Sequence, residues 1–161
     1  MSKDIIVKKG LNINLVGDAT KTLDISKNSK YYSVCPEDFH GVFPKLTIKV
    51  DEKVKAGDVL FYDKNNEQVK FVSPVSGKIT EIQRGERRRI MSIEILADKK
   101  IEYKNLGKLD VKADKNKIIE YLLNAGLWPF IKQRPYDVIA DHNISPKSIF
   151  ISGFSSAPLS A

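Results

Sequence analysis

Few residues in this 161-residue chain could perform chemistry, and none has a recognisable partner nearby. Cys35 is the single cysteine, and His40 and His142 are the only histidines. A cysteine nucleophile needs a base beside it, and a histidine base needs an orienting group and a nucleophile. We therefore expect Cys35 to be a packed or surface thiol and both histidines to have surface or packing roles. A single cysteine also allows no internal disulfide and no multi-cysteine metal or iron–sulfur site in this chain.

Other common reaction and binding motifs are also missing from the sequence. Neither a Gly-x-Gly-x-x-Gly turn nor a P-loop occurs. No run approaches the ~18 apolar residues of a membrane-spanning helix, and the amino terminus alternates charged with apolar residues instead of forming a signal-peptide core. We predict no catalytic, cofactor-binding or metal-binding residue in this chain and expect it to stay in the cytoplasm.

Basic residues give the chain a net charge of +7, and the densest block is Arg84–Arg89. A basic surface suits an acidic partner, an anionic lipid or a nucleic acid. A nucleic-acid site would interleave aromatic residues with the arginines, but a strand-like apolar run, Ile90–Ile93, follows directly. We predict that the block is a solvated hairpin tip, that no nucleic acid binds there, and that Arg87, Arg88 and Arg89 are candidates for a partner interface.

Alternating apolar residues predict strands over 11–15, 46–50 and 91–95, whereas 21–30 resembles a loop. Between the later strands lie two stretches that set turn residues among apolar ones. The first is Val54–Phe61, where Gly57 permits a tight turn, and the second is Ser73–Ile79, where Pro74 halts a strand and Gly77 permits a bend. These features predict a compact all-β domain over 30–98, preceded by a strand and an irregular segment over 1–29.

This pair of motifs resembles the biotinyl/lipoyl-like "hammerhead" family, whose fold is a barrel-sandwich hybrid. The resemblance raises one alternative function, a carrier that holds biotin or lipoate on a lysine at a hairpin tip. Lys64 lies in such a hairpin, Asp63–Glu67, but its neighbours and its spacing from Gly57 and Pro74 differ from the carrier pattern. We expect Lys64 to be an ordinary charged turn residue, because a shared fold does not transfer an activity.

The character of the chain changes after residue 98. Asp114 can cap a helix predicted over 115–125, and Gly126 suits its left-handed end. A short apolar strand is expected over 148–152. We interpret 99–161 as a linker, a helix and the first strand of an α/β domain that continues in a larger polypeptide, so the fold class is mostly β with an α/β continuation.

Two aromatic and proline clusters follow the predicted helix and cannot continue it. They contain Trp128, Phe130, Arg134 and Tyr136. Core packing is the default interpretation of large aromatic residues. If the region contacts a partner, these four residues are our candidates for that interface.

A narrower resemblance spans nearly the whole chain. The strings that carry it, in order, are Lys8–Leu11, Val54–Phe61, Asp63–Lys64, Ser73–Gly77, Arg84–Arg88, Gly126–Trp128, Arg134–Pro135 and Ser148–Phe150. Their joint order resembles the A-subunit family of sodium-translocating NADH:quinone reductases. The related C-subunit family of Rnf-type electron-transport complexes shares only part of it and remains an alternative.

The A-subunit resemblance implies a peripheral protein on the cytoplasmic face of the bacterial inner membrane. It implies that the other subunits of the respiratory complex are partners and that quinone is a candidate ligand. It also implies that the flavins and the iron–sulfur centre belong to other subunits, that NADH and quinone are substrates of the whole complex, and that this chain has a structural role.

Overall fold

The computed structural model describes residues 16–17, 20, 22, 29–110 and 112–153. The chain divides into two compact units, residues 28–145 and residues 1–27 with 146–161. The strand predicted over 11–15 lies outside the described residues, as does most of the loop over 21–30.

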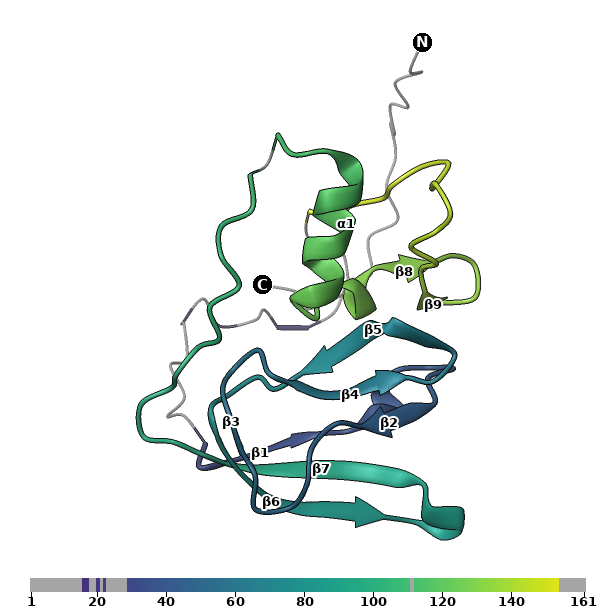
Figure 1. Ribbon diagram of the computed structural model, residues 1–161. Coiled ribbons are helices and arrows are strands. Elements are labelled where there is room, and N and C mark those ends of the chain that lie inside the picture. Colours follow the sequence, from purple (N-terminus) through teal and green to yellow (C-terminus); the bar gives the residue numbers. More distant parts are fainter. Residues whose placement is uncertain (1–15, 18–19, 21, 23–28, 111, 154–161) are drawn as a thin grey trace. The chain divides into compact units, whose positions relative to one another are not determined.

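Two antiparallel β-sheets dominate the larger unit (Figure 1). The four-stranded sheet has the order β1-β7-β6-β3 and the three-stranded sheet the order β2-β4-β5. The strands of the first are β1 (Tyr31–Val34), β3 (Lys53–Val54), β6 (Gly77–Arg84) and β7 (Ile90–Ala97). Those of the second are β2 (Pro44–Leu46), β4 (Val59–Asp63) and β5 (Asn66–Val72).

One hydrophobic core lies between these sheets. Its fully buried members include Ile79, Ile93 and Ile95 from the four-stranded sheet. From the three-stranded sheet come Phe61 and Phe71, whose rings stack with centroids 4.4 Å apart. Alternate residues of a strand point to the same face of a sheet. The alternating apolar residues therefore place their large side chains between the sheets, and the predicted all-β unit is confirmed.

Gly57 adopts the turn conformation that the first motif predicts, with a φ of +96°. Its backbone N–H donates to the Ser73 carbonyl at 2.8 Å, and the Ser73 N–H donates to the Asp58 carbonyl at 2.8 Å. The Asp58 carboxylate also accepts from the Lys55 N–H at 2.8 Å. The two motifs are therefore joined directly by backbone hydrogen bonds.

Gly77 plays a different part from the predicted bend. It is the first residue of β6, and a Cβ built on it would lie 2.1 Å from the Leu96 carbonyl oxygen of β7. The absence of a side chain, rather than a special φ, is what this position requires. The bend falls just before it, between the end of β5 and the start of β6.

The strand predicted over 46–50 is mostly wrong, because β2 ends at Leu46. Thr47 still donates from its backbone N–H to the Leu60 carbonyl at 3.0 Å, but the chain then turns. The Lys49 N–H donates to the Glu52 carboxylate at 2.8 Å, and Asp51 has a φ of +70°. The strand predicted over 91–95 is confirmed within β7.

The predicted helix is confirmed as α1 (Lys115–Asn124). The Asp114 carboxylate accepts from the Asn116 N–H at 3.0 Å, and Gly126 ends the helix with a φ of +69°. α1 packs against β5 beneath it (Figure 1), and Leu123 is its buried residue. No helix in the described part of the chain is long and apolar enough to cross a membrane.

Short elements complete the fold. The 3-10 helices are η1 (Pro36–Asp38), η2 (Glu86–Arg88) and η3 (Trp128–Phe130). β8 (Lys132–Gln133) and β9 (Val138–Ile139) form a two-stranded hairpin after η3.

The strand predicted over 148–152 is wrong. These residues form no regular element, and Ile149, Phe150 and Ile151 are exposed. A strand needs a neighbour that takes its backbone hydrogen bonds, and no described strand pairs with this segment.

Candidate interaction surface

The arginine block forms the tip of the β6–β7 hairpin, as predicted. We call residues Gly85–Arg89 the arginine tip. The Gly85 N–H donates to the Arg89 carbonyl at 2.8 Å and closes the loop. Arg87 and Arg88 have φ values of +53° and +61°, a left-handed conformation that side-chain-bearing residues rarely adopt. All three arginines of the tip are exposed.

Only one of these arginines has an acidic partner within the described residues. Arg89 Nε lies 3.0 Å from Glu37 Oε1 on η1. Arg87 and Arg88 form no ion pair with any described residue. The arginine tip therefore presents two exposed guanidinium groups beside a third that is already bound to a carboxylate.

Trp128 does not offer the surface proposed for it in a partner interface. Its side chain is 8% exposed and belongs to the hydrophobic core, and its indole N–H donates to the Ala140 carbonyl at 2.7 Å. Burial of the ring and satisfaction of its one polar group make it a core residue. Core packing, the default interpretation from the sequence, is confirmed at this position.

Phe130 lies two residues further along and is 70% exposed. Its ring meets the edge of Phe39, with centroids 6.2 Å apart, and Phe39 in turn packs on Phe71 at 4.6 Å. Lys132 Nζ lies 5.7 Å from the centroid of Phe39. Phe130 is thus anchored on one side by the core and is open to contact by a partner on the other.

Arg134 and Tyr136 lie in the turn between β8 and β9. Arg134 pairs with Asp137 across this turn at 3.5 Å, and Tyr136 is 76% exposed. The four aromatic-cluster candidates therefore separate into a core residue, a residue beside η1 and two residues in a hairpin turn. Partner binding by Phe130, Arg134, Tyr136 and the arginines stays a prediction.

The residues that sequence reasoning missed are Glu37 and Phe39. Glu37 lies in η1 and binds Arg89, and Phe39 follows η1 and contacts Phe130. Nothing in the sequence marks this segment, because its role depends on contacts with residues distant in the chain. This segment contacts the arginine tip through Glu37 and Phe130 through Phe39.

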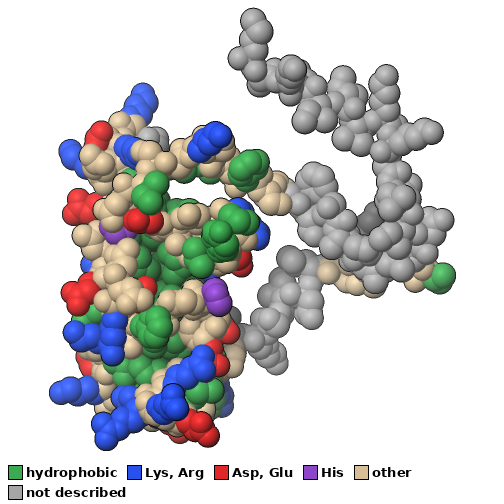
Figure 2. Space-filling model, turned by 90° about the vertical axis from the view of Figure 1, so that its right-hand side faces the viewer, with side chains coloured by type: hydrophobic (Ala, Val, Ile, Leu, Met, Phe, Trp, Pro, Cys, Tyr) green, Lys and Arg blue, Asp and Glu red, His purple; other side chains and the backbone are tan. Residues whose placement is uncertain are grey.

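Figure 2 shows the larger unit from the side at which the β6–β7 hairpin ends. Lys and Arg side chains gather at its lower end, where the β6–β7 hairpin lies in Figure 1, and hydrophobic side chains are exposed above them. Acidic side chains are interspersed, so the face is a mixed surface with a basic end rather than a uniformly basic one.

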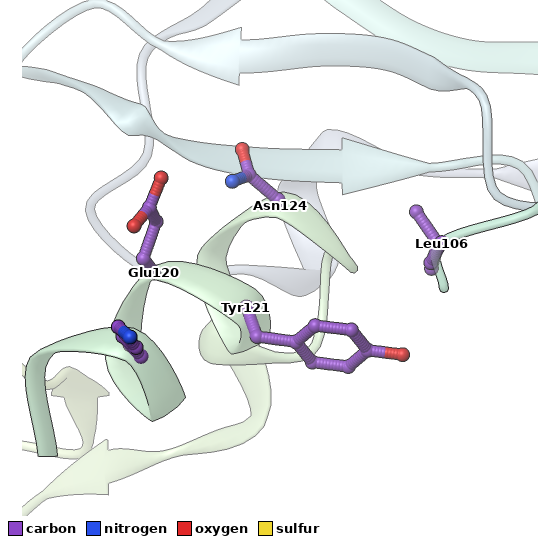
Figure 3. A pocket seen from close by; sticks show the side chains of 5 residues that line it. Leu106, Glu120, Tyr121 and Asn124 are labelled. Atoms are coloured by element: carbon purple, nitrogen blue, oxygen red, sulfur yellow. The ribbon is translucent and has the colours of Figure 1, made fainter. Parts of the chain in front are cut away.

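Two shallow hollows lie near α1. The first, of about 230 Å³, is seen in Figure 3 between α1 and the segment that precedes it. Its lining residues are Leu106, Lys117, Glu120, Tyr121 and Asn124. The second, of about 340 Å³, lies beside His142 and the first turns of α1. Neither joins a nucleophile to a base, and we assign no reaction to them.

The remaining reactive groups have structural surroundings. His142 Nδ1 lies 3.2 Å from Asn66 Nδ2 and its ring meets Trp128, which fits the expected packing role. His40 is exposed, and Cys35 is half-buried with Ser33 Oγ 3.7 Å away. Lys64 is exposed in the turn between β4 and β5. The described residues contain no group of acidic, histidine or cysteine side chains suited to a metal ion.

Comparison with known families decides the classification. Residues 5–98 match the NqrA N-terminal barrel-sandwich hybrid domain, and residues 113–161 match the NqrA second alpha/beta domain. The chain belongs to the NqrA family. The predicted fold class, a barrel-sandwich hybrid followed by an α/β domain, is thereby confirmed, and the boundaries drawn at 29/30 and 98/99 stay predictions.

Curated relatives of the NqrA family are named as the A subunit of Na(+)-translocating NADH-quinone reductase. The one from Saccharophagus degradans is 31% identical over 160 residues, which are 98% of this chain and 36% of the relative. The one from Marinomonas sp. is 32% identical over 158 residues, and the one from Vibrio vulnificus 33% over 164. The chain spans 36% of the length of each of these relatives. The match favours the NqrA family over the Rnf-type and carrier alternatives.

Proposed function

We propose that this chain serves in the NqrA component of a Na+-translocating NADH:quinone reductase, where it is a structural and binding module. The observation that carries the proposal is the pair of family matches over residues 5–98 and 113–161. Three relatives are 31–33% identical to this chain over at least 96% of its length. Two consecutive domains of one family match this chain together. A shared fold with an unrelated role explains these matches less well than membership of the same component does.

The described residues support a binding role rather than a reaction. They present an exposed arginine tip and an exposed Phe130, whereas Cys35, His40 and His142 have no paired catalytic group among them. We propose that the chain acts by holding partners in place. We propose that its partners are the other subunits of the reductase, that it lies on the cytoplasmic face of the membrane, and that flavins and the iron–sulfur centre are carried by those other subunits.

The test is purification of the full-length protein from its own membranes with an affinity tag. We expect membrane-embedded subunits to co-purify after mild detergent extraction, together with NADH-driven, sodium-stimulated quinone reduction. Deletion of the gene should abolish that activity, and the wild-type gene should restore it. Recovery of the protein free of membrane subunits, with quinone reduction intact in the deletion strain, would overturn the proposal.

A further inference from the structure

We infer that the arginine tip and Phe130 form one docking surface for an acidic segment of a protein partner that also carries an apolar side chain. The inference names the chemistry of the partner for the binding role proposed above, and in that respect it rests on the proposed function. It does not depend on which subunit supplies the segment.

The first observation is that two guanidinium groups of the arginine tip have no ion pair within the described part of the chain. Arg87 and Arg88 are exposed, left-handed in φ and without an ion pair among the described residues. The hydrogen bond from the Gly85 N–H to the Arg89 carbonyl holds the loop that carries them. The backbone that carries the two arginines is therefore already ordered before a partner binds. This preorganisation lowers the entropic cost of binding.

The second observation is that the arginine tip already binds a carboxylate within this chain. Arg89 Nε contacts Glu37 Oε1 at 3.0 Å, and Glu37 lies in the short acidic turn η1. A guanidinium presents paired N–H donors that match a carboxylate. The neighbours Arg87 and Arg88 can bind a further acidic segment in the same way.

The third observation is continuity between the charged and aromatic parts. Glu37 binds the arginine tip, and Phe39, two residues later, contacts Phe130 at a centroid distance of 6.2 Å. Phe130 keeps 70% of its surface exposed. Aromatic residues and arginines are both enriched among the residues that dominate protein interfaces. An apolar side chain on the partner segment would cover this ring.

An acidic protein segment fits this surface better than an anionic membrane. Proteins that lie on anionic membranes present basic and apolar side chains together to the lipid. Carboxylates on the same surface are repelled by the anionic headgroups. Here Glu86 lies within the arginine tip, Glu37 of η1 pairs with Arg89, and Asp38 follows Glu37 on η1. A flat anionic surface would meet these carboxylates, whereas a flexible segment can place its own carboxylates on the arginines alone.

The experiment measures binding of the full-length protein to a labelled synthetic peptide in which glutamates and aspartates flank one phenylalanine. The reference probe is the same peptide with glutamine and asparagine in place of the acids. The variants are Arg87→Glu/Arg88→Glu and Phe130→Ser, and the matched control is Lys99→Glu/Lys100→Glu, an exposed basic pair beyond the far end of β7. Thermal unfolding verifies that each variant folds, as expected for exposed positions.

We expect the wild type to prefer the acidic peptide and to lose affinity as salt rises. Arg87→Glu/Arg88→Glu should lose about tenfold or more in affinity and most of the salt dependence, whereas Phe130→Ser should weaken binding and keep the salt dependence. The lysine control should match the wild type. Equal binding of both peptides, or wild-type affinity in the arginine variant, would overturn the inference. So would binding to phosphatidylglycerol vesicles, through the same arginines, without binding to the acidic peptide.

This readout is separable from the proposed function. The peptide assay uses the isolated protein, whereas the proposed function is tested by co-purification from membranes. Peptide binding without co-purification would refute the reductase assignment and leave the docking surface intact. If the protein co-purifies with membrane subunits but does not bind the acidic peptide, only the docking surface is refuted.

Discussion

Gly77 lies so close to the Leu96 carbonyl that no side chain can occupy its position: a Cβ there would be 2.1 Å from the carbonyl oxygen and 2.9 Å from its carbon. The obstacle is backbone of the neighbouring strand, β7, and cannot move aside as a flexible side chain would. Gly77 pairs with Ala97 of β7 at the point where the second turn motif enters the sheet.

Gly77→Ala should therefore destabilise the protein by about 3 kcal/mol, the upper part of the range for overpacking. Gly85→Ala is the matched control, because its Cβ would meet only the flexible end of the Met91 side chain, at 2.9 Å. Chemical denaturation monitored by circular dichroism measures both. Equal stability of the two variants would show that the β6–β7 contact relaxes freely and that Gly77 is dispensable.

Trp128 and Phe130 should differ sharply on truncation, although they are two residues apart. Trp128→Ala removes a core ring that is 8% exposed and leaves the Ala140 carbonyl without its donor, and we expect a loss of about 3–5 kcal/mol. Phe130→Ala removes a ring that is 70% exposed and should cost less than about 1 kcal/mol. The free energy of unfolding from urea titration checks both values.

Tryptophan fluorescence provides an independent control, because Trp128 is the single tryptophan. The wild type and Phe130→Ala should share a blue-shifted emission maximum that moves to the red on unfolding. A red-shifted maximum in the folded wild type would contradict the buried position of Trp128.

Features with a local cause can be predicted from the sequence. The Gly57 turn, the arginine hairpin and α1 depend on residues within a few positions of each other, and the sequence predicts all three. The strand over 148–152 could not be judged in this way, since an apolar run becomes a strand only when a neighbour supplies hydrogen bonds. Likewise, composition treats Trp128 and Phe130 alike, and only the packing of η3 separates core from surface.

In the candidate surface, too, features with a local cause could be predicted and contacts between distant segments could not. The arginines could be predicted from their density, but Glu37 could not, because its pairing with Arg89 depends on where the fold places η1. Nor could the link from Phe39 to Phe130 be inferred, since these rings come from segments far apart in the chain.

Asp114 should contribute to the stability of α1 through its carboxylate. The carboxylate accepts from the Asn116 N–H at 3.0 Å, and this bond satisfies one backbone donor at the start of the helix. Asp114→Ala should cost about 1 kcal/mol, whereas Asp114→Ser should retain most of the stability, because a hydroxyl can cap in the same way. Thermal unfolding of the three proteins measures the difference. Indistinguishable melting of the alanine variant and the wild type would mean that α1 is held by packing on β5 alone.

Lys64 should stay unmodified when the protein is produced together with a biotin or lipoate ligase. The lysine is exposed in a hairpin turn of a barrel-sandwich hybrid domain, so access alone does not prevent ligation. Its neighbour Asp63 is engaged, however, since its carboxylate accepts from the N–H groups of Phe43 and Asn65, each at 3.1 Å. These bonds tie the turn to the segment before β2, so the backbone around Lys64 is held in place by the rest of the domain. Intact-mass spectrometry, with an authentic carrier domain as the positive control, should show the unmodified mass. A biotinyl or lipoyl adduct that disappears in Lys64→Arg would instead establish a carrier activity for this domain.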